Sequence, residues 1–359
     1  MSIPRHLKHF LTTKGPRHAV ERTGEVVWRF TGGRRRFRRR LEDYQDFFVA
    51  RGFRLTFCVT ASLVKRHRDL FRALADQGHE IAAHGYAHTR MDQYGPARQR
   101  ELVEASYQAL TEAGFKVTGF RAPYLNFNDD TIEALRRSSF SWTSGELLWW
   151  QGDRPSTGEV ERLRSLYRFL EESEGGLFPR WDGSLVHLPM TAPDDELLFE
   201  RWKIRDGDEL AGIWIDTFRR HHEKGGYHHQ FFHPERFPLI RPALDRLLEE
   251  VRSHGDAVWT PTLGELATWW REHSAVQQGG DSETSLPRNL GTLKRRNPET
   301  SEPRNPGTPE PRNPETPEPR NPEPGTRVHW PHGARSCFVL SADVCAVDLW
   351  DFVFRSFEF

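Results

Sequence analysis

The chain has 359 residues, enough for two domains or for one large domain with extensions. Lysine plus arginine and aspartate plus glutamate each number 51, so the formal net charge is zero, which argues against a dedicated nucleic-acid-binding protein. No stretch of about 18 apolar residues predicts a membrane span, and the N-terminus lacks the apolar core of a secretory signal. The three cysteines, Cys58, Cys337 and Cys345, follow no metal or disulfide spacing, so we expect a cytoplasmic protein.

Residues 1–275 alternate between strand and helix signals. Runs of β-branched and aromatic residues predict strands at 25–30, 53–60, 80–83, 117–121, 185–188, 227–232 and 257–260. Helical patterns occupy 101–113, 242–251 and 263–271, and apolar side chains share one helix face at Phe37, Leu41, Tyr44 and Phe48. This alternation predicts a single α/β domain, either a (β/α) barrel or an open doubly wound sheet.

Residues 276–327 differ from the rest of the chain in composition. These 52 residues contain 11 prolines, and Arg-Asn-Pro recurs every eight residues, starting at Arg296, Arg304, Arg312 and Arg320. Each proline removes a backbone donor, and the near absence of apolar side chains leaves little to offset the entropy of ordering. We expect a disordered, extended linker; the alternative is a recognition motif for a proline-binding module.

Residues 328–359 form a tail that is too short to bury a core of its own. Within it, residues 336–340 have a strand pattern that needs a partner, and Asp343 follows shortly afterwards. An aromatic-rich end at 350–354 comes next. This combination indicates docking onto the rest of the chain, association with another molecule, or truncation.

Three groups of polar residues follow predicted strands, which is where barrel enzymes place their catalytic groups. His84 and His88 come directly after one strand, and their spacing of four can bring both imidazoles to one metal ion. Arg121 lies at the end of the next strand, where a guanidinium could orient a carboxylate. His233 ends an aromatic strand and suits a general acid. Each residue alone could be structural, since the chain has 17 histidines, but together they favour a metal-assisted hydrolase.

The motifs GHEIAAHGYAH at 78–88, GFRAPY at 119–124 and FFHP at 231–234 resemble those of the polysaccharide deacetylases, the nodulation-protein-B-like family also called carbohydrate esterase family 4. The resemblance covers roughly residues 24–272. It implies a distorted (β/α) barrel of the polysaccharide deacetylase type over residues 1–275, acting on a carbohydrate substrate.

The resemblance also implies a reaction and the residues that perform it. A divalent ion, which we expect to be zinc, is held by His84 and His88, while Arg121 orients an aspartate that acts as the base. His233 protonates the leaving amine, so that acetate is released and a free amino sugar remains. Substrate contacts are expected at three aromatic residues, Tyr124, Trp142 and Trp149, whereas the tryptophan pair at 269–270 suits the core.

One part of the family's pattern is absent from its usual place. Family members carry an Asp-Asp pair at the end of the first strand, as base and metal ligand, but Thr31 and Gly32 stand there in this chain. The sequence around Asp343 resembles the beginning of a deacetylase domain, with Cys345 close to the position of the second aspartate. We favour the tail as the stump of a second deacetylase domain. The alternative is a tail that docks on the barrel and supplies Asp343.

Other features leave alternatives open. Asp129 and Asp130 are further candidates for a third metal ligand but suit the first turn of a helix better. The basic run at 34–40 could contact an acidic glycan, although a solvated helix face explains it more simply. If the base is missing, the chain is a glycan-binding relative without turnover; a third possibility is an amidohydrolase acting on a small amide.

Overall fold

The computed structural model describes residues 33–149, 167–171, 177–277 and 328–347. The strand expected at 25–30, the pair Thr31-Gly32 and residues 278–327 of the linker lie outside the described residues. The helices are α2 (Gly33–Val49), α3 (Val64–Asp76), α4 (Pro96–Glu112), α5 (Asp129–Arg136), α7 (Gly207–Glu223), α8 (Phe237–Ser253) and α9 (Leu263–Gln277). The strands are β1 (Thr56–Val59), β2 (Glu80–Ala83), β3 (Gly119–Arg121), β4 (Trp142–Ser144), β5 (Leu147–Trp149), β6 (Phe169–Glu171), β7 (Arg180–Trp181), β8 (Val186–His187), β9 (Met190–Thr191), β10 (Tyr227–Phe232), β11 (Val258–Trp259) and β12 (Ser336–Val344).

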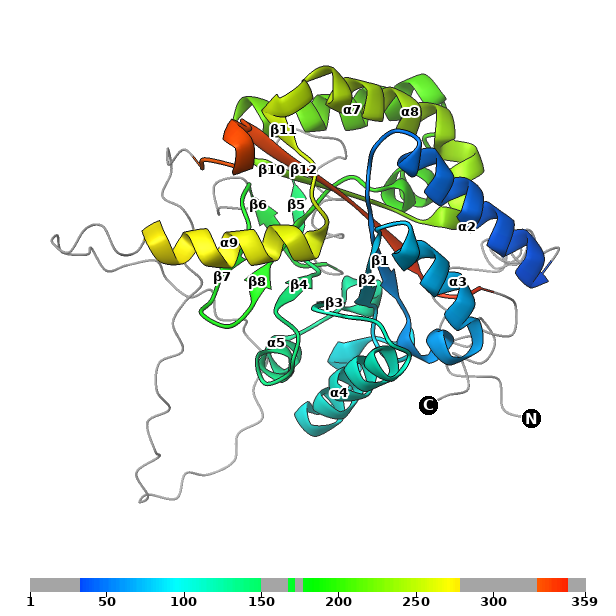
Figure 1. Cartoon of the computed structure of the whole chain (residues 1–359), viewed down its shortest axis with the longest axis vertical. Helices are drawn as coiled ribbons and strands as arrows, with labels where there is room; N and C mark the ends of the chain where they lie inside the picture. Colours follow the sequence, from blue (N-terminus) through cyan, green and yellow to red (C-terminus); the bar gives the residue numbers. More distant parts are fainter. Residues whose placement is uncertain (1–32, 150–166, 172–176, 278–327, 348–359) are drawn as a thin grey trace, which may run out of the picture.

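The described strands form one large sheet and one small one. The large sheet runs in the order β10-β12-β1-β2-β3-β4-β8-β7, with β11 paired to β12, and the small sheet has the order β6-β5-β9. Neighbouring strands are parallel throughout except β7 and β8. Helices surround the central strands (Figure 1). The predicted α/β barrel type of fold is therefore confirmed.

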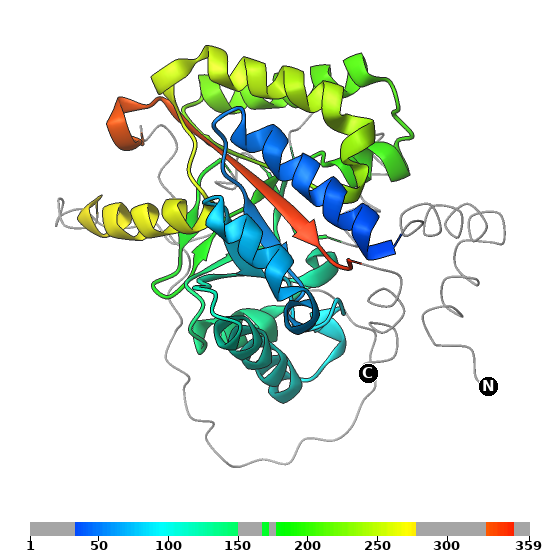
Figure 2. The ribbon, with the colours of Figure 1, turned by 45° about the vertical axis from the view of Figure 1, so that its right-hand side comes forward.

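The strand from the C-terminal tail lies in the interior of the large sheet. β12 is parallel to both of its neighbours, and its register places Asp343 opposite Cys58 of β1 and Ala342 opposite Phe232 of β10. The long red strand runs alongside the blue β1 in both views (Figures 1 and 2). All nine residues of β12 are buried. This placement is the one that the docking alternative describes: the tail contributes an interior strand to the sheet, so the described sheet extends beyond residues 1–275.

The two faces of β12 have different surroundings because side chains alternate along a strand. Phe338, Leu340 and Ala342 join the main core under the helices, where the Phe338 ring meets Phe218 of α7 at 5.5 Å. Residues on the other face, such as Val339, join a second core cluster inside the sheet. A central parallel strand buried on both faces is expected to be apolar on both. Polar residues on the inner face of β12 are therefore informative.

A tryptophan ahead of β12 anchors the tail to the barrel. Trp330 is only 2% exposed and packs among Trp259, Trp269 and Trp270, with ring centroids 5.3–6.4 Å apart. Its indole nitrogen donates a hydrogen bond of 2.9 Å to the carbonyl oxygen of Gly225. The core role expected for the tryptophan pair is thus confirmed for Trp270, whereas Trp269 is partly buried against the same cluster, and this aromatic cluster explains how the tail is held.

The basic run near the start of the described chain lies on α2. Its apolar face is buried as predicted, at Phe37, Leu41, Tyr44 and Phe48. On the opposite face, Arg35, Arg36 and Arg39 are exposed, and Arg38 forms ion pairs with Glu42 and Asp69. This is the solvated helix face that the sequence favoured. In the parts of the chain that are described, no helix has the length and apolar character needed to cross a bilayer.

Candidate metal and catalytic site

The candidate site lies where several parallel strands end. His84 directly follows β2, Arg121 is the last residue of β3, and His233 directly follows β10. Asp343 is the penultimate residue of β12. Because parallel strands point the same way, their carboxyl ends meet at one edge of the sheet. The sheet therefore gathers residues that are up to 259 positions apart in the chain.

A buried ion pair links the barrel to the tail. Arg121 is 0% exposed, and its Nη1 donates a hydrogen bond of 2.6 Å to Oδ1 of Asp343. Its Nη2 donates to the hydroxyls of Ser341, at 2.8 Å, and Ser144, at 3.2 Å. Burial alone would raise the pKa of Asp343, but the charges of Arg121, His84 and His233 outweigh it and lower that pKa. Asp343 is therefore an oriented, ionised carboxylate.

The neutral imidazole of His229 lies within hydrogen-bond distance of the Arg121 guanidinium. His229 Nε2 lies 3.2 Å from Arg121 Nη2 and 2.8 Å from Ser341 Oγ, while its Nδ1 lies 2.8 Å from the Tyr227 hydroxyl. Burial, aided by the charge of Arg121, holds the pKa of His229 well below its usual value. The neutral ring can accept hydrogen bonds at Nε2. Sequence reasoning missed this residue, although its position in a strand that ends in two phenylalanines was a signal that a buried imidazole there needs partners.

His84 and His88, which follow strand β2, lie close together. The ring centroids of His84 and His88 are 5.0 Å apart. His84 Nδ1 lies 3.2 Å from the Arg121 carbonyl oxygen, and its Nε2 lies 3.7 Å from Oδ2 of Asp343. Burial lowers the pKa of His84 in spite of the nearby carboxylate, which favours the neutral imidazole that binds metals. A ring nitrogen fixed by a backbone carbonyl is the usual second contact of a metal-binding histidine.

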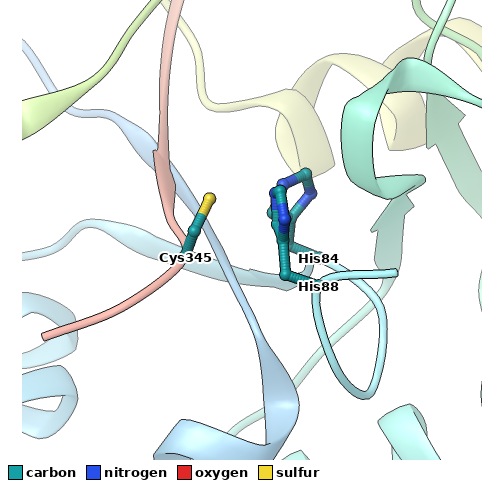
Figure 3. Close-up of side chains that lie close together, drawn as sticks. All are labelled: His84, His88 and Cys345. Atoms are coloured by element: carbon teal, nitrogen blue, oxygen red, sulfur yellow. The ribbon is translucent and has the colours of Figure 1, made fainter. Parts of the chain in front are cut away.

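Cys345 completes a group of possible metal ligands. One ligand atom from each of His84, His88 and Cys345 lies within 4.8 Å of the others. Figure 3 shows the cysteine, on the chain that leaves β12, beside the two imidazoles. Two imidazoles and a thiol are a donor set that zinc accepts, so the residues present fit the expected ion.

The other proposed third ligands have a different role. Asp129 and Asp130 lie in the first turn of α5, which is capped by the Asn128 side chain. Asp129 is exposed and pairs with Arg168 at 2.8 Å. The helix-start interpretation of these two acids therefore holds.

His233 is held by an acid that follows the small sheet. Its Nδ1 lies 2.8 Å from Oδ1 of Asp195, whose Oδ2 accepts a hydrogen bond of 3.0 Å from the His233 backbone. Burial would lower the pKa of His233, but the charge and hydrogen bond of Asp195 raise it to about 10. The neighbouring Asp194 has its pKa raised to about 7, by burial and by the charges of Asp195 and Glu196. His233 is thus a protonated imidazole at neutral pH.

Two of the three expected substrate contacts are wrong. Trp142 is fully buried, and its ring packs so closely on Gly119 that a Cβ there would lie 1.8 Å away. Trp149 is 6% exposed and packs edge-to-face against Trp202. Both indoles fill the interior because their strands are buried, so neither can stack on a sugar. Tyr124, by contrast, is 47% exposed and lies 4.3 Å from the His88 ring, measured between centroids.

Fold and site together define a class: an α/β barrel with imidazoles, a guanidinium and a carboxylate gathered at its strand ends. Comparison with known proteins shows what part of the chain is similar to. Residues 32–141 match the family model described as polysaccharide deacetylase. Over these residues the chain is similar to the polysaccharide deacetylases, as its motifs led us to expect.

Individual similar proteins show how far the likeness extends in sequence and in fold. The peptidoglycan deacetylase-like protein FGM2 of Gibberella zeae is 37% identical over 70 residues, which are 19% of this chain and 21% of that protein. Two crystal structures assigned as polysaccharide deacetylases share the fold. The one from Mycobacterium smegmatis has a TM-score of 0.50 at 21% identity and covers 70% of this chain and 82% of its own. The one from Pseudomonas aeruginosa PAO1 has a TM-score of 0.51 at 21% identity and covers 69% and 75%.

Proposed function

We propose that the protein is a metal-dependent hydrolase that removes acetyl groups from an N-acetylated carbohydrate. The observation that carries the proposal is the buried pair of Arg121 and Asp343 beside His84. It supplies the carboxylate that the sequence lacks at Thr31-Gly32. The family match supports deacetylation as the reaction class, and the name of the Gibberella relative makes glycan strands of peptidoglycan one substrate to test.

His84 and His88 would hold a divalent ion, and we expect zinc. The chemistry that such an ion supplies when bound is polarisation of the acetamide carbonyl and activation of water. His84 is prepared for this role because the Arg121 carbonyl fixes one ring nitrogen and leaves Nε2 turned toward Asp343. Tyr124, exposed beside His88, would form one side of the place where the sugar lies.

Asp343 would take a proton from the attacking water. Its lowered pKa keeps it ionised at neutral pH, and the 2.6 Å contact to Arg121 leaves Oδ2 on the side of His84. General-base catalysis of this kind contributes about 10²–10⁴-fold to the rate. Arg121 would therefore act as a positioning residue for the base.

His233 would donate the proton that the leaving amine needs. Asp195 fixes its Nδ1 and keeps the ring protonated, which leaves Nε2–H available to the substrate. The acid and the base then come from different strands, β10 and β12, which are neighbours in the sheet. Acetate and a free amino sugar are the products.

The test is acetate release from N-acetylated oligosaccharides and from peptidoglycan fragments by zinc-loaded full-length protein. The expected result is turnover that falls at least about 10²-fold in His233→Gln. Asp129→Asn is the control, because that acid is exposed and pairs with Arg168. Binding of the glycan without acetate release would contradict the proposal and indicate a glycan-binding protein without turnover. Turnover of small amides alone would make the protein an amidohydrolase of another substrate class.

A further inference from the structure

We infer that Cys345 is the third protein ligand of the metal, which makes this a thiolate-containing centre with ligands from both the barrel and the tail. The inference rests on the proposed function only in requiring that His84 and His88 bind an ion. It concerns a residue at which this chain departs from the two-aspartate pattern.

Position along the chain places the thiol on the correct side. Cys345 lies two residues after Asp343, and Asp343 lies two after Ser341. In extended chain, alternate side chains point the same way. Ser341 and Asp343 both contact Arg121 inside the sheet, so Cys345 follows them on the inner face. It is 7% exposed, and Figure 3 shows it beside the two imidazoles.

The number of ligands available argues for the same residue. Zinc sites usually have at least three protein ligands, and two histidines leave one to be found. Asp343 is the rival, but its Oδ1 is engaged by Arg121 at 2.6 Å. Asp129, the other acid considered, is exposed and paired with Arg168. A thiol within 4.8 Å of both imidazole ligand atoms satisfies the count and leaves Asp343 to act as base.

A sulfur ligand sets the class of metal. Thiolates favour zinc and other soft or borderline ions, whereas carboxylates favour magnesium, calcium and manganese. The centre is therefore expected to take zinc or cobalt and to discriminate against manganese. Replacing the thiol should weaken zinc binding by more than about tenfold, since the loss of a group that only hydrogen-bonds to a metal ligand already costs about 10–100-fold.

The experiment is cobalt substitution of the full-length protein, read by absorption. Wild type should show a thiolate-to-cobalt charge-transfer band in the near ultraviolet at one cobalt per chain. Cys345→Asp should still bind cobalt but lose the band. Cys337→Ala and Cys58→Ala remove the other two thiols and should both keep it; Cys337 lies on the same buried strand, so it also controls for disturbance of β12.

X-ray absorption of the zinc-loaded wild type keeps the test decisive if a variant fails to fold. One sulfur at about 2.3 Å from zinc is expected. A wild type that binds a stoichiometric ion with only nitrogen and oxygen neighbours would overturn the cysteine ligand and leave the proposed function standing. An ion bound by sulfur in a protein that releases no acetate would support the cysteine ligand and overturn the proposed function. Failure of the wild type to bind zinc or cobalt at all would overturn both.

Discussion

The barrel segment, residues 33–277, and the tail segment, residues 328–347, bring different chemistry to the same site. The barrel supplies the imidazoles and the guanidinium, at His84, His88, Arg121 and His233. The tail supplies the carboxylate and the thiol. Arg121 and Asp343 are 222 positions apart, yet they form a 2.6 Å hydrogen bond. The comparison teaches that the place of a strand in a parallel sheet, not its place in the chain, decides what it contributes.

The start of the tail packs against the last helix of the barrel segment. Trp330 packs on Trp270 of α9, at 5.9 Å between ring centroids, so the chain leaves and re-enters the described part near one place. The tail then needs only local contacts to enter between β10 and β1. Its two faces match the two environments there, apolar outside and polar near Arg121.

Ending the chain after Gln277 is expected to have the largest effect. The lost strand carries Phe338, Val339, Leu340 and Val344, each buried and each worth about 1.5–3 kcal/mol. Together these contributions are comparable with the whole stability of a domain, about 5–15 kcal/mol. We expect the cooperative thermal transition, followed by circular dichroism, to disappear.

A matched deletion separates loss of the strand from loss of the linker. A variant without residues 288–318 keeps the tail and should melt like the full-length protein. An unchanged transition in the chain ending at Gln277 would show that the barrel segment is complete without β12.

Asp343→Asn tests the chemistry that the tail contributes. Turnover should fall by about 10²–10⁴-fold, because the base is lost. Stability should also fall, by about 3–5 kcal/mol, because Arg121 is left as a buried charge without its carboxylate. Initial rates and thermal melts on the same samples separate the two effects. Asp129→Asn makes the same change at an exposed acid and should alter neither, and equal turnover of the two variants would rule out Asp343 as the base.

Trp330→Ala tests the anchor rather than the chemistry. Removing a buried tryptophan should cost about 3–5 kcal/mol. The folded fraction should keep its turnover, because Trp330 is in the aromatic cluster of α9 and not among the site residues. Urea unfolding measures the loss, with the adjacent and exposed His329→Ala as control. A change within about 0.5 kcal/mol, the usual range for surface substitutions, would mean that this cluster does not hold the tail.

Asp195→Asn is expected to have the smallest effect on the maximal rate, measured at a pH where His233 is still protonated, and a clear effect on the pH profile. In wild type, Asp195 raises the pKa of His233 to about 10, so the general acid stays protonated and the alkaline limb of kcat/KM lies near that pH. Without the carboxylate, burial dominates and the pKa falls, so the limb moves to lower pH. An alkaline limb that does not move would exclude His233 as the acid.

The same substitution changes stability with pH in a defined direction. A histidine whose folded pKa is raised stabilises the protein fully below its unfolded pKa of about 6.5. That contribution is lost as pH rises through about 10. The difference in free energy of unfolding between wild type and Asp195→Asn should therefore be largest at acidic pH and shrink above neutrality.

Local patterns predicted the elements well because local physics determines them. The strands expected at 80–83 and 227–232 are β2 and β10 with the same bounds. The helix face through Leu41 and Tyr44 is buried as its spacing indicates. Arg121, His84 and His233 were singled out because each lies at the end of a strand or directly after it. Such signals depend on a few neighbouring residues only.

What the sequence could not decide depends on non-local packing. The pattern at 336–340 indicated a strand that needs a partner, but nothing local names β1 and β10 as its neighbours. In the same way, the residues next to a tryptophan in the sequence do not show whether its indole stacks on a sugar or packs in the core. Trp142 and Trp149 are both buried in the core.

Hydrogen exchange of the backbone amides in β12 tests the central claim most directly. The claim is that the C-terminal strand is an interior strand of the sheet and thereby brings Asp343 to Arg121. If it is, the amides of residues 336–344 in the full-length protein should exchange as slowly as those of β1 and β10, since all three share one set of parallel hydrogen bonds. Exchange at the rate of an unprotected peptide, while β1 and β10 remain protected, would contradict the account.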